Sequence, residues 1–218
     1  MKVGVLGTGT VGTAIGNRLI DLGHEVRMGS RQAGNERAAA WAESAGDRAG
    51  SGDFAAAASF GEIGFNCTAG EHSVEAVGSA KKELAGKLLI DVANALAFSD
   101  GSAPVISATD RNSLGEQIQR ALPETRVVKA LNTVNSDVMV DPARVPGDHV
   151  IFVSGDDQAA KGQATQLLGE FGWPEDRVID LGGITTARGP EMYVALWLRL
   201  MGALDSTQFN IGLLRPAT

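Results

Sequence analysis

Three closely spaced glycines stand directly after the first apolar run of the chain. Gly7, Gly9 and Gly12 form the pattern Gly-x-Gly-x-x-Gly after the apolar residues 3–6. In such a pattern the first glycine permits a tight turn, the second lets backbone approach a pyrophosphate, and the third lets the next helix pack close to the strand. The N-terminal amides of that helix then face the anion. The dinucleotide-binding residues predicted here are Gly7, Thr8, Gly9, Thr10, Val11 and Gly12.

The surrounding residues predict the strand and helix that such a turn must join. Residues 3–6 are typical of a buried strand, and the apolar positions within residues 14–22 share one face of a helix. Gly23 suits the end of that helix, and residues 24–28 predict a second strand. This order of elements separates a nucleotide-binding motif from a chance glycine-rich turn.

The residues after the second strand indicate which dinucleotide is bound. Sites for NAD usually carry an Asp or Glu about 20 residues past the glycines, where it accepts hydrogen bonds from the ribose 2′-hydroxyl. This chain has Gly29, Ser30 and Arg31 there instead. A hydroxyl and a guanidinium suit a 2′-phosphate. We therefore predict that Ser30 and Arg31 bind NADP in preference to NAD.

Composition excludes several other classes of protein. The 218 residues are 44% hydrophobic and 21% charged, which is enough for one well-buried core. A formal net charge of −7 argues against nucleic acid as a partner. No apolar run approaches the roughly 20 residues of a membrane span, and no signal peptide fits before Val3. We expect a cytoplasmic protein without membrane association, whose single Cys67 packs in the core.

Strand and helix signals alternate along the chain, which predicts an α/β fold: a Rossmann-like, doubly wound, mostly parallel sheet with a C-terminal helical extension. Further strands are predicted at residues 62–68, 87–92, 126–131, 149–154 and 177–181. Helices are predicted at residues 36–45, 53–58, 70–84, 113–121 and 158–171, with a loop at 46–52. Ligands of such sheets gather at the carboxyl ends of the strands. Residues 1–184 would form the nucleotide-binding domain and residues 185–218 its C-terminal extension.

The last predicted helix, residues 190–204, is apolar on nearly every side. A helix of this kind is buried all round, and one face of a sheet covers only one side of it. We expect a second subunit to cover the rest in a homodimer, with Leu196 and Leu200 on one contacting stripe. The alternative is burial under the chain's own tail, residues 208–214.

The sequence shows no acid–base pair and no spacing of metal ligands. His24, His72 and His149 are scattered, so no metal is predicted and no catalytic side chain is assigned. Hydride transfer between two redox cofactors needs only that donor and acceptor carbons be held close and aligned. Polar residues predicted at strand ends would do this, with a small-molecule redox co-substrate as the partner. The positioning candidates are Thr68, Asn94, Asn132, Thr133 and His72.

Several segments together resemble the NADP oxidoreductases typified by the F420-dependent NADP reductase, a fold shared with the reductase domain of the STEAP metalloreductases. They are residues 6–12, 22–26, 29–31, 127–133, 153–157 and 186–189, so the resemblance spans the whole chain. It implies that Thr8, Ser30 and Arg31 hold the 2′-phosphate, and that Thr68, Ala69 and Asn94 flank the nicotinamide. It also implies a homodimer that transfers hydride between NADPH and the deazaflavin coenzyme F420.

The chain departs from that pattern at three places. Asn35 stands where some members carry a basic residue, with Arg37 nearby; Ala69 and Gly70 replace a bulky Pro-Trp; and Asn132 replaces a histidine. A flavin therefore stays open as an alternative acceptor. A non-catalytic NADPH-binding module that reports cofactor state to a partner protein is the alternative function.

Overall fold

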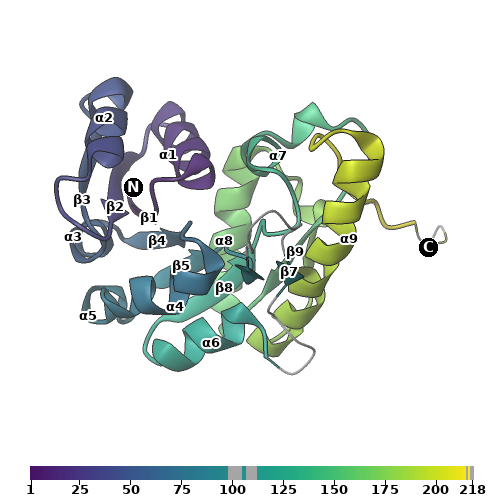
Figure 1. Ribbon diagram of the computed structural model, residues 1–218. Coiled ribbons are helices and arrows are strands. Elements are labelled where there is room, and N and C mark those ends of the chain that lie inside the picture. The colour runs from purple at the N-terminus through teal and green to yellow at the C-terminus, as the bar shows by residue number, and fades with distance from the viewer. Residues whose placement is uncertain (98–104, 107–111, 215, 217–218) are drawn as a thin grey trace.

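An eight-stranded sheet forms the centre of the computed structural model, which describes residues 1–97, 105–106, 112–214 and 216 (Figure 1). The strand order is β10-β9-β8-β5-β4-β1-β2-β3. The strands are β1 Lys2–Leu6, β2 Glu25–Ser30, β3 Ala49–Asp53, β4 Ile63–Asn66, β5 Leu88–Asp91, β8 Arg126–Ala130, β9 Ile151–Ser154 and β10 Val178–Asp180. Two short strands, β6 Leu96–Ala97 and β7 Val105–Ile106, form a separate antiparallel pair.

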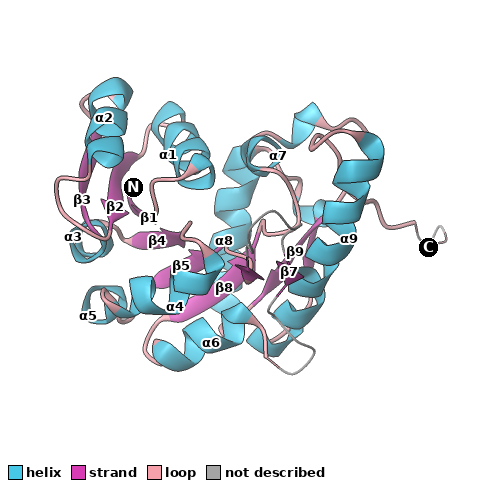
Figure 2. Cartoon of the chain, in the orientation of Figure 1, coloured by secondary structure: helices cyan, strands magenta, loops and turns pink. Residues whose placement is uncertain are grey.

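Helices cover both faces of this sheet (Figure 2). They are α1 Thr10–Asp21, α2 Glu36–Ala45, α3 Phe54–Phe60, α4 Gly70–Gly78, α5 Lys81–Leu84, α6 Leu114–Ala121, α7 Ser136–Val140, α8 Gln158–Phe171 and α9 Arg188–Leu204. Helices α1, α2, α7 and α8 contribute to one buried cluster, and α3 to α6 contribute to the other. The predicted α/β, doubly wound fold is therefore confirmed.

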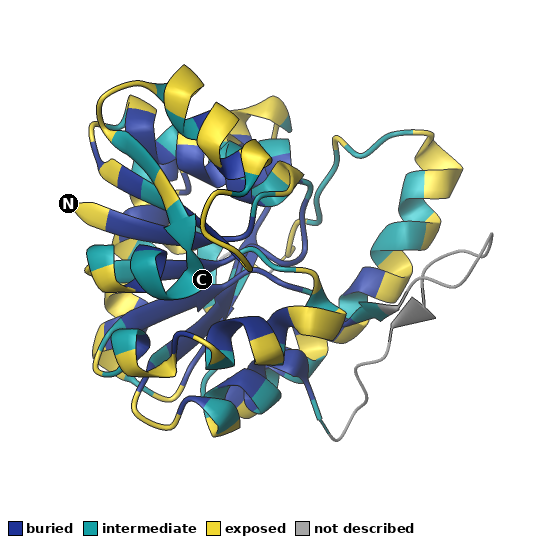
Figure 3. Ribbon diagram, turned by 60° about the vertical axis from the view of Figure 1, so that its left-hand side comes forward, coloured by how far each residue is buried: buried dark blue, intermediate teal, exposed yellow. Residues whose placement is uncertain are grey.

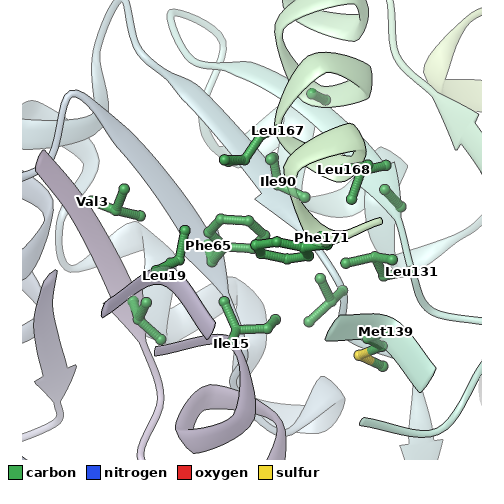
Figure 4. Packing of buried hydrophobic residues seen from close by; sticks show 14 of the residues in the cluster. Val3, Ile15, Leu19, Phe65, Ile90, Leu131, Met139, Leu167, Leu168 and Phe171 are labelled. Atoms are coloured by element: carbon green, nitrogen blue, oxygen red, sulfur yellow. The ribbon is translucent and has the colours of Figure 1, made fainter. Parts of the chain in front are cut away.

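Aromatic and branched side chains join α1 and α8 through the larger cluster (Figure 4). Phe65 of β4 stacks on Phe171 of α8 with ring centroids 6.2 Å apart. Ile15 and Leu19 of α1 pack beside them and are fully buried. This packing fixes the glycine-rich turn at the start of α1 relative to the middle of the sheet.

The sheet is mostly parallel, as predicted, and the pair of β8 and β9 is the exception. β9 pairs antiparallel with β8, and β10 pairs parallel with β9, so these two strands run opposite to the other six. The connection from β8 contains α7, which was not predicted, and returns to the edge at which β8 ends. β9 therefore enters from that edge, and the ends of β9 and β10 do not join the carboxyl ends of the other strands.

Three further local predictions need correction. Residues 49–52, predicted as part of a loop, and Asp53, predicted as the start of a helix, form the edge strand β3 beside β2. The predicted helix 70–84 is two helices, because Ala80 has non-helical dihedral angles between α4 and α5. Strand β6 was not predicted either.

Helix α9 stands out from the body of the protein (Figure 3). The expectation that it is buried on all sides does not hold within one chain, because Met192 and Leu196 are 47% and 54% exposed. The tail covers part of it, since Phe209 stacks on Trp197 at 5.3 Å. None of the helices in the described residues is long and apolar enough to cross a membrane.

Candidate active site

The glycine-rich turn lies between β1 and α1, opposite the end of the neighbouring strand β4. Gly7 has a φ of +128°, and a Cβ there would clash with the carbonyl oxygen of Cys67. A Cβ on Gly12 would clash with the carbonyl oxygen of Gly7, whereas one on Gly9 would meet nothing within 4 Å. Gly7 and Gly12 are thus required by packing, while the open space at Gly9 is where a ligand can approach the backbone.

The N-terminus of α1 suits an anion. Gly9 is its N-cap, no side chain caps the helix, and its first turn carries no acidic residue. The amides of the first turn therefore lack a side-chain acceptor, and the positive end of the helix dipole is not neutralised by a carboxylate of this turn. Both features favour a bound phosphate group.

Two cavities meet at the ends of β1 and β4. The first, here the arginine cavity, has a volume of about 580 Å³ and is lined by Gly9, Ser30 and Arg31 among others. Arg37 and Phe54 also line it. From the sequence, Arg37 was noted only as a residue near Asn35, and Phe54 was not predicted. Among the described residues, neither Arg31 nor Arg37 has a hydrogen-bonding or ion-pair partner. Two free guanidiniums thus border one cavity.

Two other side chains near the arginine cavity are already engaged. The Ser30 hydroxyl donates a hydrogen bond of 2.6 Å to the carbonyl oxygen of Gln32. Asn35 caps α2 by accepting a hydrogen bond from the amide of Ala38 at 3.1 Å. Asn35, at the position where a basic residue is absent, therefore has a structural role, and Arg37 on the first turn of α2 brings a second positive charge to the cavity.

The second cavity, here the asparagine cavity, has a volume of about 400 Å³ and lies at the carboxyl edge of the central strands. Thr10, Val11 and Asn94 line it together with Val134 and Met139, which belong to the connection after β8. Three consecutive residues that follow β4 line both cavities: Cys67, Thr68 and Ala69. The structure thus brings together the predicted residues of the glycine turn, the end of β4 and the end of β5.

The remaining candidates occupy different places. Asn132 and Thr133 are 4% and 2% exposed, and Asn132 bonds to Asn94 beside the asparagine cavity. His72, on α4, lines the arginine cavity and has a side chain 54% exposed, with Glu71 3.8 Å away. It is therefore not on the same cavity as Asn94.

Cys67 is partly buried: it packs against the larger cluster and also lines both cavities. Burial, and to a lesser degree the negative charge of Asp91, raises the pKa of the Cys67 thiol. A neutral thiol is a poor nucleophile. Within the described part of the chain, no three His, Cys, Asp or Glu side chains are grouped as metal ligands.

Comparison with known proteins identifies the family. The F420-dependent NADP reductase of Methanothermobacter marburgensis is 30% identical over 212 residues, which cover 92% of each chain. This chain belongs to that reductase family. Residues 2–95 match the family described as NADP oxidoreductase coenzyme F420-dependent. The protein is therefore an oxidoreductase, as the resemblance implies.

Two further relatives are similar to this chain over most of its length. A crystal structure of a putative F420-dependent NADP-reductase from Arthrobacter sp. FB24 is 45% identical, covers 99% of this chain and 100% of that chain, and superposes with a TM-score of 0.91. The metalloreductase STEAP3 of Rattus norvegicus is 28% identical over 200 residues, which are 92% of this chain and 37% of that protein. The superposition with the Arthrobacter structure supports the Rossmann-like architecture along nearly the whole chain.

Proposed function

We propose that this protein transfers a hydride between NADPH and a deazaflavin of the coenzyme F420 type. The two guanidiniums of Arg31 and Arg37, free of protein partners among the described residues and beside the arginine cavity, are the observation that supports NADPH most directly. A guanidinium binds phosphate through paired, charge-assisted hydrogen bonds. The strand β2 ends at Ser30 without the acid that would favour NAD.

The residues present fit a bound dinucleotide. The uncapped start of α1 would hold the pyrophosphate, Ser30, Arg31 and Arg37 the 2′-phosphate, and Thr68, Ala69 and Asn94 the nicotinamide half. NADPH, when bound, supplies the hydride. The residues of the asparagine cavity would hold the two reacting rings in register, and the apolar Val11, Val92 and Met139 would exclude water. The transfer needs no acid or base among them.

The name of the relative from M. marburgensis supports F420 as the acceptor. Ala69 and Gly70 line the asparagine cavity, and neither carries a bulky side chain. A Cβ on Gly70 would clash with the carbonyl oxygen of Asn94, so a glycine is needed for this close approach. We also propose a homodimer in which the exposed side of α9 is covered by the second subunit, since Leu196 is 54% exposed in one chain.

The test is to mix the protein with NADPH and a panel of deazaflavin, flavin and carbonyl acceptors, and to follow the nicotinamide absorbance. We expect oxidation of NADPH by the deazaflavin at a rate well above that with the others. Fast oxidation by a flavin alone would replace the proposed acceptor. Tight NADPH binding with no oxidation by any acceptor would overturn the enzymatic proposal in favour of a cofactor-sensing module.

A further inference from the structure

A row of buried polar side chains crosses three central strands beside the asparagine cavity. Asn66 of β4 pairs with Asp91 of β5 in the sheet register, and Asp91 pairs with Lys129 of β8. All three residues are fully buried. The Asn66 amide donates to Asp91 Oδ1 at 2.8 Å, and Lys129 Nζ lies 2.6 Å from Asp91 Oδ2. The row is therefore continuous across the middle of the sheet.

Glu191, in the first turn of α9, extends this row beyond Lys129. Its Oε1 lies 2.9 Å from Lys129 Nζ, and its carboxylate accepts hydrogen bonds from the amides of Leu114 and Gly115 at 2.7 and 2.9 Å. These amides belong to the first turn of α6, so Glu191 caps the start of α6. It is also the acidic residue in the first turn of its own helix, α9. The positive end of α6 thus balances the second carboxylate of the cluster.

Electrostatics keep Lys129 charged within this cluster. Burial alone would lower the pKa of Lys129, but the carboxylates of Asp91 and Glu191 outweigh it and raise the pKa above its ordinary value. Gly115 makes room for this arrangement, because a Cβ there would lie only 3.3 Å from Lys129 Cε. Lys129 is consequently an ammonium group enclosed by fixed acceptors.

Lys129 and Asn66 both contact residues that line the asparagine cavity. Lys129 Nζ donates to the carbonyl oxygen of Ala93 at 2.7 Å, and the amide of Ala93 donates to Asp91 Oδ1 at 3.1 Å. At the other end, the Thr68 hydroxyl donates to Asn66 Oδ1 at 2.7 Å. Ala93, Thr68 and the adjacent Asn94 all line the cavity.

We propose that Lys129 is a positioning residue for hydride transfer, which with Asp91 and Glu191 fixes the Ala93–Asn94 backbone beside the nicotinamide. This inference rests on the proposed function for the identity of the substrate. The contacts of Lys129 with Asp91, Glu191 and Ala93 do not depend on it. A buried ion pair adds little stability compared with apolar residues of similar volume, whereas removal of one partner is costly. A positional role accounts for the buried charges of this cluster, because Asp91 and Lys129 both bond to the backbone of Ala93 at the asparagine cavity.

The decisive variant removes the Lys129 contact and keeps the net charge of the cluster unchanged, because one carboxylate and one ammonium group are lost together. In Asp91→Asn/Lys129→Met, the side-chain carbonyl of the introduced amide can still accept from Asn66 and Ala93, and Glu191 keeps its two backbone amides. The matched control is Lys161→Met/Asp180→Asn, because Lys161 Nζ donates to Asp180 Oδ1 at 2.8 Å in a pair between α8 and the edge strand β10, remote from the cavity.

We expect the double variant to bind NADPH within about threefold of the wild type and to lower kcat by about 10- to 100-fold, the scale of modest misalignment. The primary deuterium isotope effect with 4-deuterated NADPH should rise, and the fluorescence of bound NADPH should shift. The control variant should match the wild type in all four measurements. A double variant with wild-type kcat, isotope effect and fluorescence would overturn the proposal.

Two further measurements distinguish a failure of the proposed function from a failure of the positional role of Lys129. If wild-type protein reduces no acceptor, the proposed function fails, and the fluorescence of bound NADPH in the double variant still decides the positional role. If the double variant does not fold, Glu191→Gln takes its place, because it weakens the hold on Lys129 and leaves Asp91 unchanged. A Glu191→Gln protein with unshifted NADPH fluorescence would then reject the proposal.

Discussion

The side chains of Asn94 and Asn132 bond to each other across the carboxyl edge of the sheet. Asn94 Nδ2 donates to the backbone oxygen of Asn132 at 2.7 Å, and Asn132 Nδ2 donates to Asn94 Oδ1 at 2.9 Å. Leu131, directly before Asn132, has a φ of +61°, a conformation that costs a non-glycine residue on the order of 1–2 kcal/mol. Strain of this kind is often found at functional sites, where the surrounding structure maintains it.

The unequal roles of the two amides lead to the first prediction. Asn132→Ala removes one of the two hydrogen bonds, because the backbone oxygen of residue 132 remains, whereas Asn94→Ala removes both. We expect both variants to slow hydride transfer by about 10- to 100-fold through misalignment, with the larger loss in Asn94→Ala. Stopped-flow measurement of NADPH oxidation, with NADPH affinity measured in parallel, compares them.

The control for this pair is Gln119→Ala, which loses an amide with three backbone hydrogen bonds around the end of α6. It should lower stability and leave the rate of transfer per folded molecule unchanged. A loss of about a millionfold in Asn132→Ala would contradict the positioning role and would instead reveal a catalyst in the chemical step.

The sequence predicts the parts of the fold that local patterns determine. The bounds predicted for α2 and α8 agree with the structure, because in each a side-chain cap, Asn35 or Asp157, stands directly before an amphipathic run. β3 was missed because its sequence, Ala-Gly-Ser-Gly-Asp, has no apolar alternation. It is a strand because β2 provides hydrogen-bonding partners along its whole length.

Only part of the candidate site could likewise be predicted from local sequence patterns. The glycine turn and the pair Ser30 and Arg31 each form a short sequence motif and were predicted. The cluster of Asp91, Lys129 and Glu191 instead joins residues that are far apart along the chain. A charged residue inside the apolar run 127–131 was the available sign that Lys129 is buried with partners. Its partners depend on the strand order and on the docking of α9, which local patterns do not encode.

A second prediction concerns the choice of cofactor. NADPH should bind more than tenfold more tightly than NADH, because charge-assisted hydrogen bonds to a phosphate contribute about 1.5–3 kcal/mol. Arg31→Ala should remove most of that preference, and Arg37→Ala a further part, with NADH affinity nearly unchanged. Fluorescence titration with both cofactors measures this, with Arg144→Ala, exposed near α7, as the control. Equal affinities of the wild type for NADPH and NADH would contradict the prediction.

A third prediction concerns pH and the start of α9. The Arg188 guanidinium bonds to Glu116 through Nε at 2.8 Å and Nη2 at 2.6 Å, and Glu116 completes the capping box of α6. Its hydrogen bond from Arg188, opposed by burial and aided by Ser113, lowers the pKa of Glu116 from 4.5 to about 2. Because the folded value is the lower one, the stabilisation is present above about pH 4.5 and is lost as pH falls toward 2.

Glu116→Gln should therefore destabilise the protein by about 1–3 kcal/mol at pH 7, and the difference from the wild type should shrink below about pH 4.5. Urea unfolding at several pH values measures this difference. Glu43→Gln, a change at an exposed position of α2, serves as the control and should follow the wild type at every pH. A deficit in Glu116→Gln that stays constant down to pH 3 would contradict the assignment.

The last prediction concerns the exposed side of α9. Met192, Leu196 and Leu204 remain 47%, 54% and 55% exposed although Phe209 of the tail covers Trp197. In addition, the Trp197 Nε1 and Tyr193 hydroxyl groups are shielded from solvent without a hydrogen-bonding partner among the described residues. An apolar helix left in this state favours self-association, and a two-fold dimer is the commonest arrangement.

We expect the wild-type protein to have twice the 22.6 kDa mass of the chain in light scattering at micromolar concentration. Leu196→Glu should give the single-chain mass with an unchanged circular dichroism spectrum, because this side chain is more than half exposed and its loss leaves no cavity. Leu200→Glu, at a half-buried position one turn later, should also dissociate the dimer but lower the melting temperature as well. Gln163→Glu, which introduces the same acid at an exposed position of α8, should leave the mass unchanged. A wild-type mass of one chain would reject the dimer, and a Leu196→Glu protein that stays dimeric would show that this face of α9 lies outside the interface.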